Sequence, residues 1–310
     1  MTQQTAVTRP AAGRGQAARV PLVYRIPWRQ IVVYTLAILF ALYIFLPFYW
    51  IVVMSFSPEV DMISVPPRWL PNLTFANFWA FVRPTQAQIA ASDGAVAALG
   101  RSLLNSAIVA VSTTILCLIL SVLAAYTFAR LRFHGSGILL GVYLATRMVP
   151  GIALIIPFYL LMRNLNLLDT YWALILSYST FSLPFIIWIL KDYFRSIPGD
   201  IEDAARVDRC GWFRMMWKVF LPIAAPGLVA ASVFSFMNAW NEFMFALFMT
   251  STIRSETVPV IAATFANDFN NVQYVGMAAA GVVAVVPPLL VALVFQRLIV
   301  QGLAAGSVKG

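Results

Sequence analysis

The residues that could carry out chemistry are few in this sequence of 310 residues. His134 is the single histidine and there are two cysteines, too few for a metal site or a disulfide framework. Each lysine follows leucine, tryptophan or valine, so the Gly-Lys pair of a nucleotide-binding P-loop does not occur. One histidine without paired carboxylates also leaves no nucleophile-and-base arrangement. The sequence therefore predicts a protein that is not an enzyme and that binds neither a metal nor a cofactor of its own.

Two ionisable residues lie inside long stretches that are otherwise uncharged. Arg147 interrupts residues 135–162, and Glu242 interrupts residues 219–249. A charge at membrane depth is costly and is a functional candidate by default, here for a path that a solute could follow. The two residues could equally pair with each other and only fix the packing of two helices. Hydrogen-bonding and stacking groups close to Glu242 extend this candidate translocation path: Asn238, Trp240 and Asn241.

The elements that must position these residues are membrane-spanning helices. Apolar residues make up 61% of the sequence and charged residues 11%, whereas soluble domains have about 45–50% and about 25%. A helix of about 20 apolar residues crosses a bilayer. Four charge-free intervals of 29, 28, 21 and 28 residues pass this test: those between Arg29 and Glu59, Arg101 and Arg130, Asp169 and Lys191, and Asp268 and Arg297. With the two singly charged stretches, the sequence predicts an all-α membrane protein with six transmembrane helices.

Prolines inside three of these spans predict kinks, although prolines are also ordinary constituents of membrane helices. The prolines concerned are Pro150, Pro157, Pro222, Pro226, Pro287 and Pro288.

The basic residues predict the orientation of the helices. Five arginines and no acidic residue precede the first span, which places the N-terminus in the cytoplasm, and six crossings return the C-terminus there. The predicted cytoplasmic segments then hold 15 of the 21 basic residues. Three parts of a cytoplasmic-membrane protein follow: a disordered basic N-terminus at 1–29, a six-helix domain at 30–300 and a cytoplasmic tail at 301–310.

The predicted cytoplasmic loop at 191–218 has the pattern of a docking element. Pro198 and Gly199 predict a turn, and Asp200 is a plausible N-cap of a short helix. Gly211 predicts a second turn before an aromatic and methionine-rich segment that leads into the fifth span. A solvated amphipathic connector would have the same pattern, so both interpretations stay open on physical grounds.

Within this loop, Asp203-Ala204-Ala205 and the closing Val219-Phe220-Leu221-Pro222 resemble the EAA loop of ABC importer permeases. In that family the pattern is Glu-Ala-Ala, three residues, Gly, nine residues, Ile, one residue and Leu-Pro, and the spacing here matches without a gap. Asp203 replaces the usual glutamate, and Arg209 replaces the usual glycine. The bend of the loop is therefore expected to move to Gly211 or to be remodelled.

Further stretches resemble the carbohydrate branch of this family, in the subunit type related to the maltose permease MalG. They lie at residues 147–150, 167–171, 183–185, 238–243 and 302–310. The resemblance implies a type I ABC importer permease that forms half of a translocation pathway for a sugar, above all a di- or oligosaccharide, and works by alternating access. It implies as partners a second homologous permease, two copies of a cytoplasmic ATPase that binds ATP and Mg, and an extracytoplasmic substrate-binding protein.

The same resemblance implies roles for particular segments. Residues 198–217 would form the coupling helix that docks in a cleft of the ATPase, and the external loop at 250–274 would meet the binding protein. The residues implied in coupling are Asp203, Ala204, Ala205, Asp208, Arg209 and Gly211. The tail residues implied to contact the ATPase are Gly306, Lys309 and Gly310. Three alternatives stay open: a polyol or glycerol phosphate as the solute, an ion-driven secondary transporter, for which Glu242 is the one carboxylate available, and a membrane scaffold.

Overall fold

The computed structural model describes residues 28–62, 64, 68, 71–92, 94–131, 133–266 and 273–307, and every regular element among them is a helix. The side chains of residues 90, 91 and 299–307 are not among those described. The chain divides into two compact parts, residues 1–47 and 48–310. The segment predicted to be disordered, 1–29, lies outside the described residues apart from Trp28 and Arg29, which begin the first helix.

The helices follow one another along the chain with short connections. They are α1 (Trp28–Ser55), α2 (Glu59–Met62), α3 (Ala76–Val82), α4 (Gln86–Ala91), α5 (Ala95–Arg130), α6 (Ser136–Ala145), the 3₁₀ turn η1 (Thr146–Met148), α7 (Gly151–Asn164), α8 (Tyr171–Ser196), α9 (Gly199–Val207), α10 (Trp212–Met215), the π-helical η2 (Met216–Phe220), α11 (Leu221–Ile223), α12 (Ala225–Trp240), α13 (Met244–Met249), α14 (Val258–Thr264) and α15 (Tyr274–Ser307).

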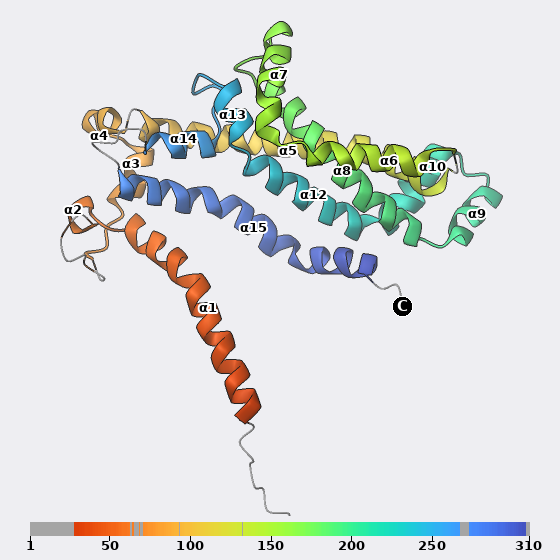
Figure 1. The fold of residues 1–310 in the computed structure, drawn as a ribbon, viewed down its shortest axis with the longest axis horizontal. Helices are drawn as coiled ribbons and strands as arrows, with labels where there is room; N and C mark the ends of the chain where they lie inside the picture. Colours follow the sequence, from red (N-terminus) through yellow and green to blue (C-terminus); the bar gives the residue numbers. More distant parts are fainter. Residues whose placement is uncertain are drawn as a thin grey trace, which may run out of the picture. The chain divides into compact units, whose positions relative to one another are not determined.

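Four long helices of the second part, α5, α8, α12 and α15, pack side by side and form its core (Figure 1). Small residues on these helices are fully buried, including Ala110, Ala125, Ala173 and Ala231. Gly227 on α12 shows why small residues are needed, because a Cβ atom there would lie 2.6 Å from the ring of Tyr193 on α8. Inside a membrane the hydrophobic effect does not drive helices together as it does in a soluble core, so helices associate through close van der Waals packing of their backbones.

Within the part of the chain that the structure describes, four helices are long and apolar enough to cross a membrane: Trp28–Ser55, Ala95–Arg130, Tyr171–Ser196 and Tyr274–Leu298. The number rises to six if each of two bent helix pairs, Ser136–Met148 with Gly151–Asn164 and Trp212–Ile223 with Ala225–Trp240, is one span. The predicted bounds of the fifth span, 219–249, are wrong. The bent pair ends at Trp240, and Glu242 lies beyond it in the connection to α13.

The two bent pairs break at prolines. The first pair bends by 96° where Pro150 precedes α7, and the second bends by 79° at Ala224, between Pro222 and Pro226. Proline removes a backbone donor and clashes with the preceding turn, so a helix bends or restarts there. The kinks predicted at Pro150, Pro222 and Pro226 are confirmed, whereas α7 continues through Pro157 and α15 continues through Pro287 and Pro288.

Candidate functional site

The predicted docking helix is α9, and it begins two residues earlier than expected. Pro198 occupies the N-cap position with φ −55° and ψ 139°, and no side chain caps the helix. The prediction of Asp200 as N-cap is therefore wrong. Asp200 instead lies in the first turn of α9, where its negative charge interacts favourably with the partial positive charge of the helix N-terminus.

The helix ends in a Schellman turn at the position where the family pattern has glycine. The Cys210 N–H donates to the Ala205 carbonyl at 3.0 Å, and the Arg209 N–H donates to the Arg206 carbonyl at 3.0 Å. This motif needs a left-handed residue, and Arg209 supplies it with φ 52°. Gly211 is extended, with φ −63° and ψ 155°, and starts α10. The bend is therefore kept at Arg209 and does not move to Gly211.

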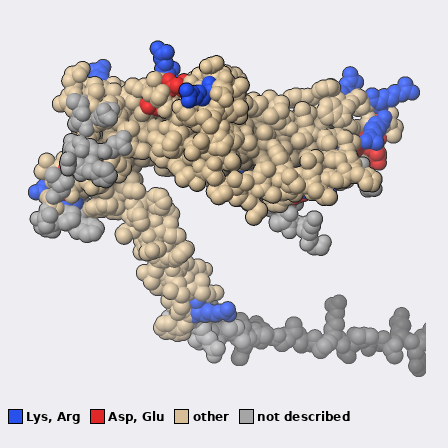
Figure 2. Space-filling model, turned by 45° about the horizontal axis from the view of Figure 1, so that its top comes forward, with Lys and Arg blue, Asp and Glu red and all other residues tan. Residues whose placement is uncertain are grey.

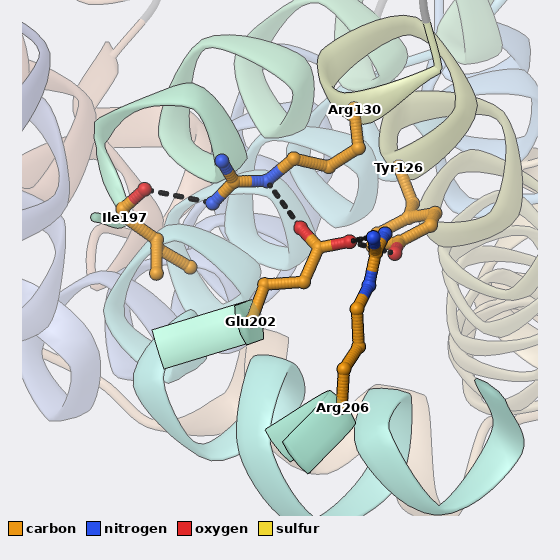
Figure 3. Close-up of polar contacts among 5 residues, drawn as sticks. All are labelled: Tyr126, Arg130, Ile197, Glu202 and Arg206. Atoms are coloured by element: carbon orange, nitrogen blue, oxygen red, sulfur yellow. Dashed lines mark hydrogen bonds and ion pairs between the residues drawn. The ribbon is translucent and has the colours of Figure 1, made fainter. Parts of the chain in front are cut away.

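A buried carboxylate, that of Glu202, connects α9 to the end of α5. Glu202 is not among the functional residues predicted from the sequence. The side chain of Glu202 has a relative exposure of 8% and accepts hydrogen bonds from the Tyr126 hydroxyl at 3.1 Å and Arg206 Nη2 at 2.6 Å (Figure 3). Its second oxygen lies 3.4 Å from Arg130 Nε, as an ion pair. Arg130 Nη2 in turn donates to the Ile197 carbonyl at 2.7 Å, just before α9 begins. This cluster of side chains is called the Glu202 cluster below.

Two local signals in the sequence could have pointed to the Glu202 cluster. Glu202 and Arg206 are four residues apart, which places them on one helix face, and Arg130 closes the last turn of a predicted span one turn after Tyr126.

The opposite face of α9 is free. Asp203, Ala204 and Asp208 are exposed, and Val207 has a relative exposure of 81%. Ala205, in contrast, is buried against the bundle. Ala204 and Ala205, both implied in coupling, therefore point to different sides, and of the two only Ala204 is exposed to a partner.

The C-terminal tail is described in part. Helix α15 runs to Ser307, so Gly306 lies in the helix, while Lys309 and Gly310 lie outside the described residues.

Arg147 and Glu242 do not pair with each other. The Arg147 guanidinium lies over the rings of Phe185 and Phe234, 5.2 and 5.9 Å from their centroids. Glu242 accepts hydrogen bonds from the N–H groups of Phe245 at 2.9 Å and Ala246 at 3.2 Å, which caps the start of α13. The alternative of an interhelical ion pair is thus wrong, because each charge finds a nearer partner.

The three remaining residues of the candidate path separate into two kinds. Asn238 and Asn241 are exposed. The side-chain NH₂ group of each donates to a backbone carbonyl one turn earlier, so these hydrogen bonds do not use the side-chain amide oxygen. Trp240 is 4% exposed, donates to the Ala284 carbonyl of α15 at 3.1 Å and stacks on Phe236. Its predicted role as a stacking face for a ligand is wrong, since the indole is used to join α12 to α15.

At the other end of the bundle, a single carboxylate organises the loop after α13. The Asp169 side chain accepts hydrogen bonds from the Ser251 and Thr252 N–H groups and from the hydroxyls of Thr252 and Ser255, at 2.5–3.1 Å. Its own N–H donates to the Met249 carbonyl at 2.8 Å, and its φ is 58°. Partial burial acts to raise the pKa of Asp169, but these hydrogen bonds outweigh it and lower the pKa.

The same loop is also fastened to α5. Asn105 Nδ2 donates to the Ile253 and Glu256 carbonyls at 2.9 and 2.8 Å, and its oxygen accepts from the Tyr171 hydroxyl at 2.7 Å. These contacts cover the first part of the predicted external loop at 250–274, and residues 267–272 lie outside the described residues.

Helices arranged in this way have known counterparts. The fold matches a solved bacterial ABC transporter involved in the import of the acidic polysaccharide alginate, with a TM-score of 0.73 and 23% identity over 87% of this chain and 96% of that chain. Residues 117–305 match the family described as "Binding-protein-dependent transport system inner membrane component". The chain belongs to this family of multi-pass membrane proteins.

Two relatives place it more closely. The chain is 36% identical over 270 residues to the trehalose transport system permease protein SugB of Mycobacterium tuberculosis, covering 86% of this chain and 93% of that protein. It is 32% identical over 274 residues to the trehalose/maltose transport system permease protein MalG of Thermococcus litoralis, covering 88% and 95%. Both relatives are transport permeases, and the resemblance to the carbohydrate branch of ABC importer permeases is confirmed.

Proposed function

We propose that this chain is the transmembrane permease subunit of an ABC transporter that imports a sugar and that it couples transport to a cytoplasmic ATPase. The observation that carries the proposal is the Glu202 cluster, which fastens α9 to α5 and leaves the acidic and apolar outer face of α9 exposed. A helix held on one side and open on the other can receive a partner and pass its motion to the bundle. The sugar is inferred from the trehalose and trehalose/maltose permeases among its relatives.

In this proposal each bent pair is one span, six helices cross the membrane, and both termini and α9 are cytoplasmic. The pathway is completed by a second homologous permease, and ATP and Mg are bound by two copies of the ATPase. The outer face of α9 supports the docking role. Asp203 and Asp208 can pair with basic groups, Ala204 permits close approach, and the Val207 side chain can enter an apolar cleft. The tail residues Gly306, Lys309 and Gly310 would add a second ATPase contact.

Helix α5 offers the physical route from one side of the membrane to the other. It is an unbroken helix of 36 residues. Tyr126 and Arg130 near one end bind the carboxylate of α9, and Asn105 near the other end binds the loop after α13. The distance along the axis from Asn105 to Tyr126 is about 32 Å, close to the thickness of the bilayer core. When the ATPase dimer closes on ATP, movement of α9 would reach the external loop, where the binding protein delivers its sugar.

The translocation path is proposed to include the break between η1 and α7. Arg147 lies about 16 Å along the helix from the start of α6, near the middle of a bilayer core. It is exposed, and its described contacts are with two aromatic rings. A charge at this depth avoids lipid and faces a water-filled cavity or another subunit. The exposed amides Asn238 and Asn241 would add hydrogen bonds to sugar hydroxyls, and Glu242 would hold the connection to α13.

The test is transport by the full chain reconstituted with its co-purifying permease, ATPase and binding protein. The loaded binding protein should stimulate ATP hydrolysis and sugar uptake. Asp203→Lys should leave the chain inserted and abolish both, because it reverses a docking charge. Arg195→Glu, a reversal of an exposed charge on α8 at the same end of the bundle, is the control and should retain both. Normal uptake by Asp203→Lys would remove the coupling role of α9, and an ATPase that never responds to the binding protein would refute the whole proposal.

A further inference from the structure

An apolar groove lies between α5 and the segment that follows α9. It has a volume of about 540 Å³ and is walled by α5 on one side and by α10, η2 and α11 on the other. Its lining side chains are large and open to the outside. Ile119 and Leu123 of α5 are 58% and 45% exposed, and Phe213 and Trp217 are 71% and 67% exposed. The volume falls in the usual range of ligand pockets, about 300–1,000 Å³.

The depth of the groove matches one leaflet of a bilayer. The α5 residues that line it, Leu118 to Leu123, lie about 10–18 Å along the helix axis from Arg130, at 1.5 Å per residue. Half of a hydrocarbon core is about 15 Å thick. The groove therefore lies at the level of the acyl chains of the leaflet on the α9 side.

The segment that forms one wall of the groove carries positive charge. Arg214 and Lys218 are exposed and directly follow the lining residues Phe213 and Trp217, and no acidic residue occurs from 209 through 218. Basic side chains gather at this end of the molecule, beside a smaller acidic group on α9 (Figure 2). Tryptophans beside basic residues mark the level of the lipid headgroups, and basic clusters there attract anionic lipids.

The segment itself is fixed in place. Met215, Met216 and Phe220 are buried against the bundle, so the outward-facing aromatics and bases are held in one orientation. The edge of the Tyr126 ring contacts both Trp212 and Phe220, with centroids 5.9 and 5.2 Å apart. Since the Tyr126 hydroxyl donates to Glu202, the groove is one ring away from the Glu202 cluster.

We propose that this groove is a binding site for an anionic phospholipid of the leaflet on the α9 side. One acyl chain fills the groove, and the phosphate of the headgroup is bound by Arg214 and Lys218. An occupied groove supports Trp212 and Tyr126 from outside and thereby stabilises the attachment of α9 to α5. The site selects the lipid by its charge as well as by its chain, because two exposed bases directly follow residues that line an apolar groove.

The test uses tryptophan fluorescence of the full chain, reconstituted with the subunits that co-purify with it. Phosphatidylcholine vesicles carry a minor fraction of a lipid brominated on its acyl chains, either phosphatidylglycerol or phosphatidylcholine. Bromine quenches nearby indoles, and the part of the signal that is lost in a Trp212→Phe/Trp217→Phe variant reports on the groove. Brominated phosphatidylglycerol should quench this part at roughly thirtyfold lower mole fraction, as expected for two basic contacts.

A matched pair of variants separates the headgroup site from general surface charge. Arg214→Gln/Lys218→Gln should abolish the preference for phosphatidylglycerol, whereas Arg195→Gln/Arg297→Gln, which removes two exposed bases elsewhere, should keep it. Equal quenching by the two brominated lipids would overturn the anionic site. The absence of quenching by either lipid would also overturn it, because the groove would then be covered by another subunit.

Discussion

Glu202 on α9 and Arg130 at the end of α5 form an ion pair in which both side chains are largely buried, with exposures of 8% and 15%. Removing one member of a buried pair leaves the other charge without compensation and costs about 3–5 kcal/mol. We therefore expect Glu202→Gln to loosen α9 and to weaken the response of ATP hydrolysis to the binding protein. Backbone hydrogen exchange across 199–210 should accelerate by about a hundredfold or more.

Asp203→Asn is the matched control for Glu202. Its side chain is exposed, so its removal should leave the exchange of 199–210 unchanged while weakening ATPase docking. If Glu202→Gln exchanged at the wild-type rate, the Glu202 cluster would not hold α9.

Arg209 has a left-handed backbone conformation, which costs an L-amino acid other than glycine about 1–2 kcal/mol. Arg209→Gly should relieve this strain and stabilise the Schellman turn by about 1 kcal/mol, after the larger entropy loss of glycine on folding. The measurement is slower hydrogen exchange of the Cys210 N–H, which donates to Ala205. Gly211→Ala, at a position with φ −63° and open space around the Cβ, should change this rate little. A faster rate in Arg209→Gly would show that contacts of the arginine side chain matter more than its backbone.

Gly227 on α12 lies in close contact with Tyr193 on α8. Gly227→Ala would place a methyl group 2.6 Å from the Tyr193 ring, so α12 must shift, at a cost of about 1–3 kcal/mol. We expect a lower thermal transition of the detergent-solubilised chain. Gly281→Ala on α15 has open space and should have little effect. Tyr193→Ala combined with Gly227→Ala should recover part of the loss, and failure to do so would place the clash elsewhere.

Asp169 should make the loop at 250–257 sensitive to acid. The pKa of Asp169 in the folded protein is below the ordinary value of about 4 for aspartate. Ionised Asp169 therefore stabilises the loop fully above about pH 4, and this stabilisation is lost as the pH falls through the lower pKa of the folded protein. Asp169→Asn should remove this contribution at neutral pH and raise hydrogen exchange at Ser251 and Thr252 by about tenfold.

Glu256 provides a contrast of opposite sign on the same loop. Burial first, and then the negative charge of Asp169, raise the pKa of Glu256. Because the pKa of Glu256 is raised in the folded protein, ionisation of this carboxyl group at higher pH destabilises the loop. Glu256→Gln should therefore slow backbone hydrogen exchange of the loop at neutral pH. Identical changes in the two variants would contradict this assignment.

Arg147→Gln tests the proposed path. The variant should assemble normally, because the lost contacts are with two half-buried rings, and it should lower the maximal rate of uptake by about tenfold or more. The assembled fraction, measured by size-exclusion chromatography, is the control. A loss of assembly with normal uptake per assembled complex would show that Arg147 only packs against Phe185 and Phe234.

Much of the architecture was predictable because hydrophobicity and proline act locally. The uncharged stretches at 102–129 and 170–190 correspond to α5 and α8, and the break at Pro150 follows from a missing backbone donor. The EAA-like spacing also located α9 correctly, because the residues of this motif all lie within one continuous segment of the chain. Such features need no knowledge of what the segment packs against.

The tertiary structure decided which side chains of these segments act together. Asp203 stood out in the sequence, yet the rotation of α9 on α5 buries its neighbour Glu202 and leaves Asp203 exposed. Arg147 had Glu242 as a possible partner in the sequence, but the packing of α8 and α12 places the aromatic rings of Phe185 and Phe234 beside it instead. The composition of a segment determines whether its helix can cross a membrane. Successive residues of a helix point in directions about 100° apart, so neighbouring side chains contact different parts of the protein. The rotation of the helix about its axis, which decides these contacts, is set by the helices packed against it.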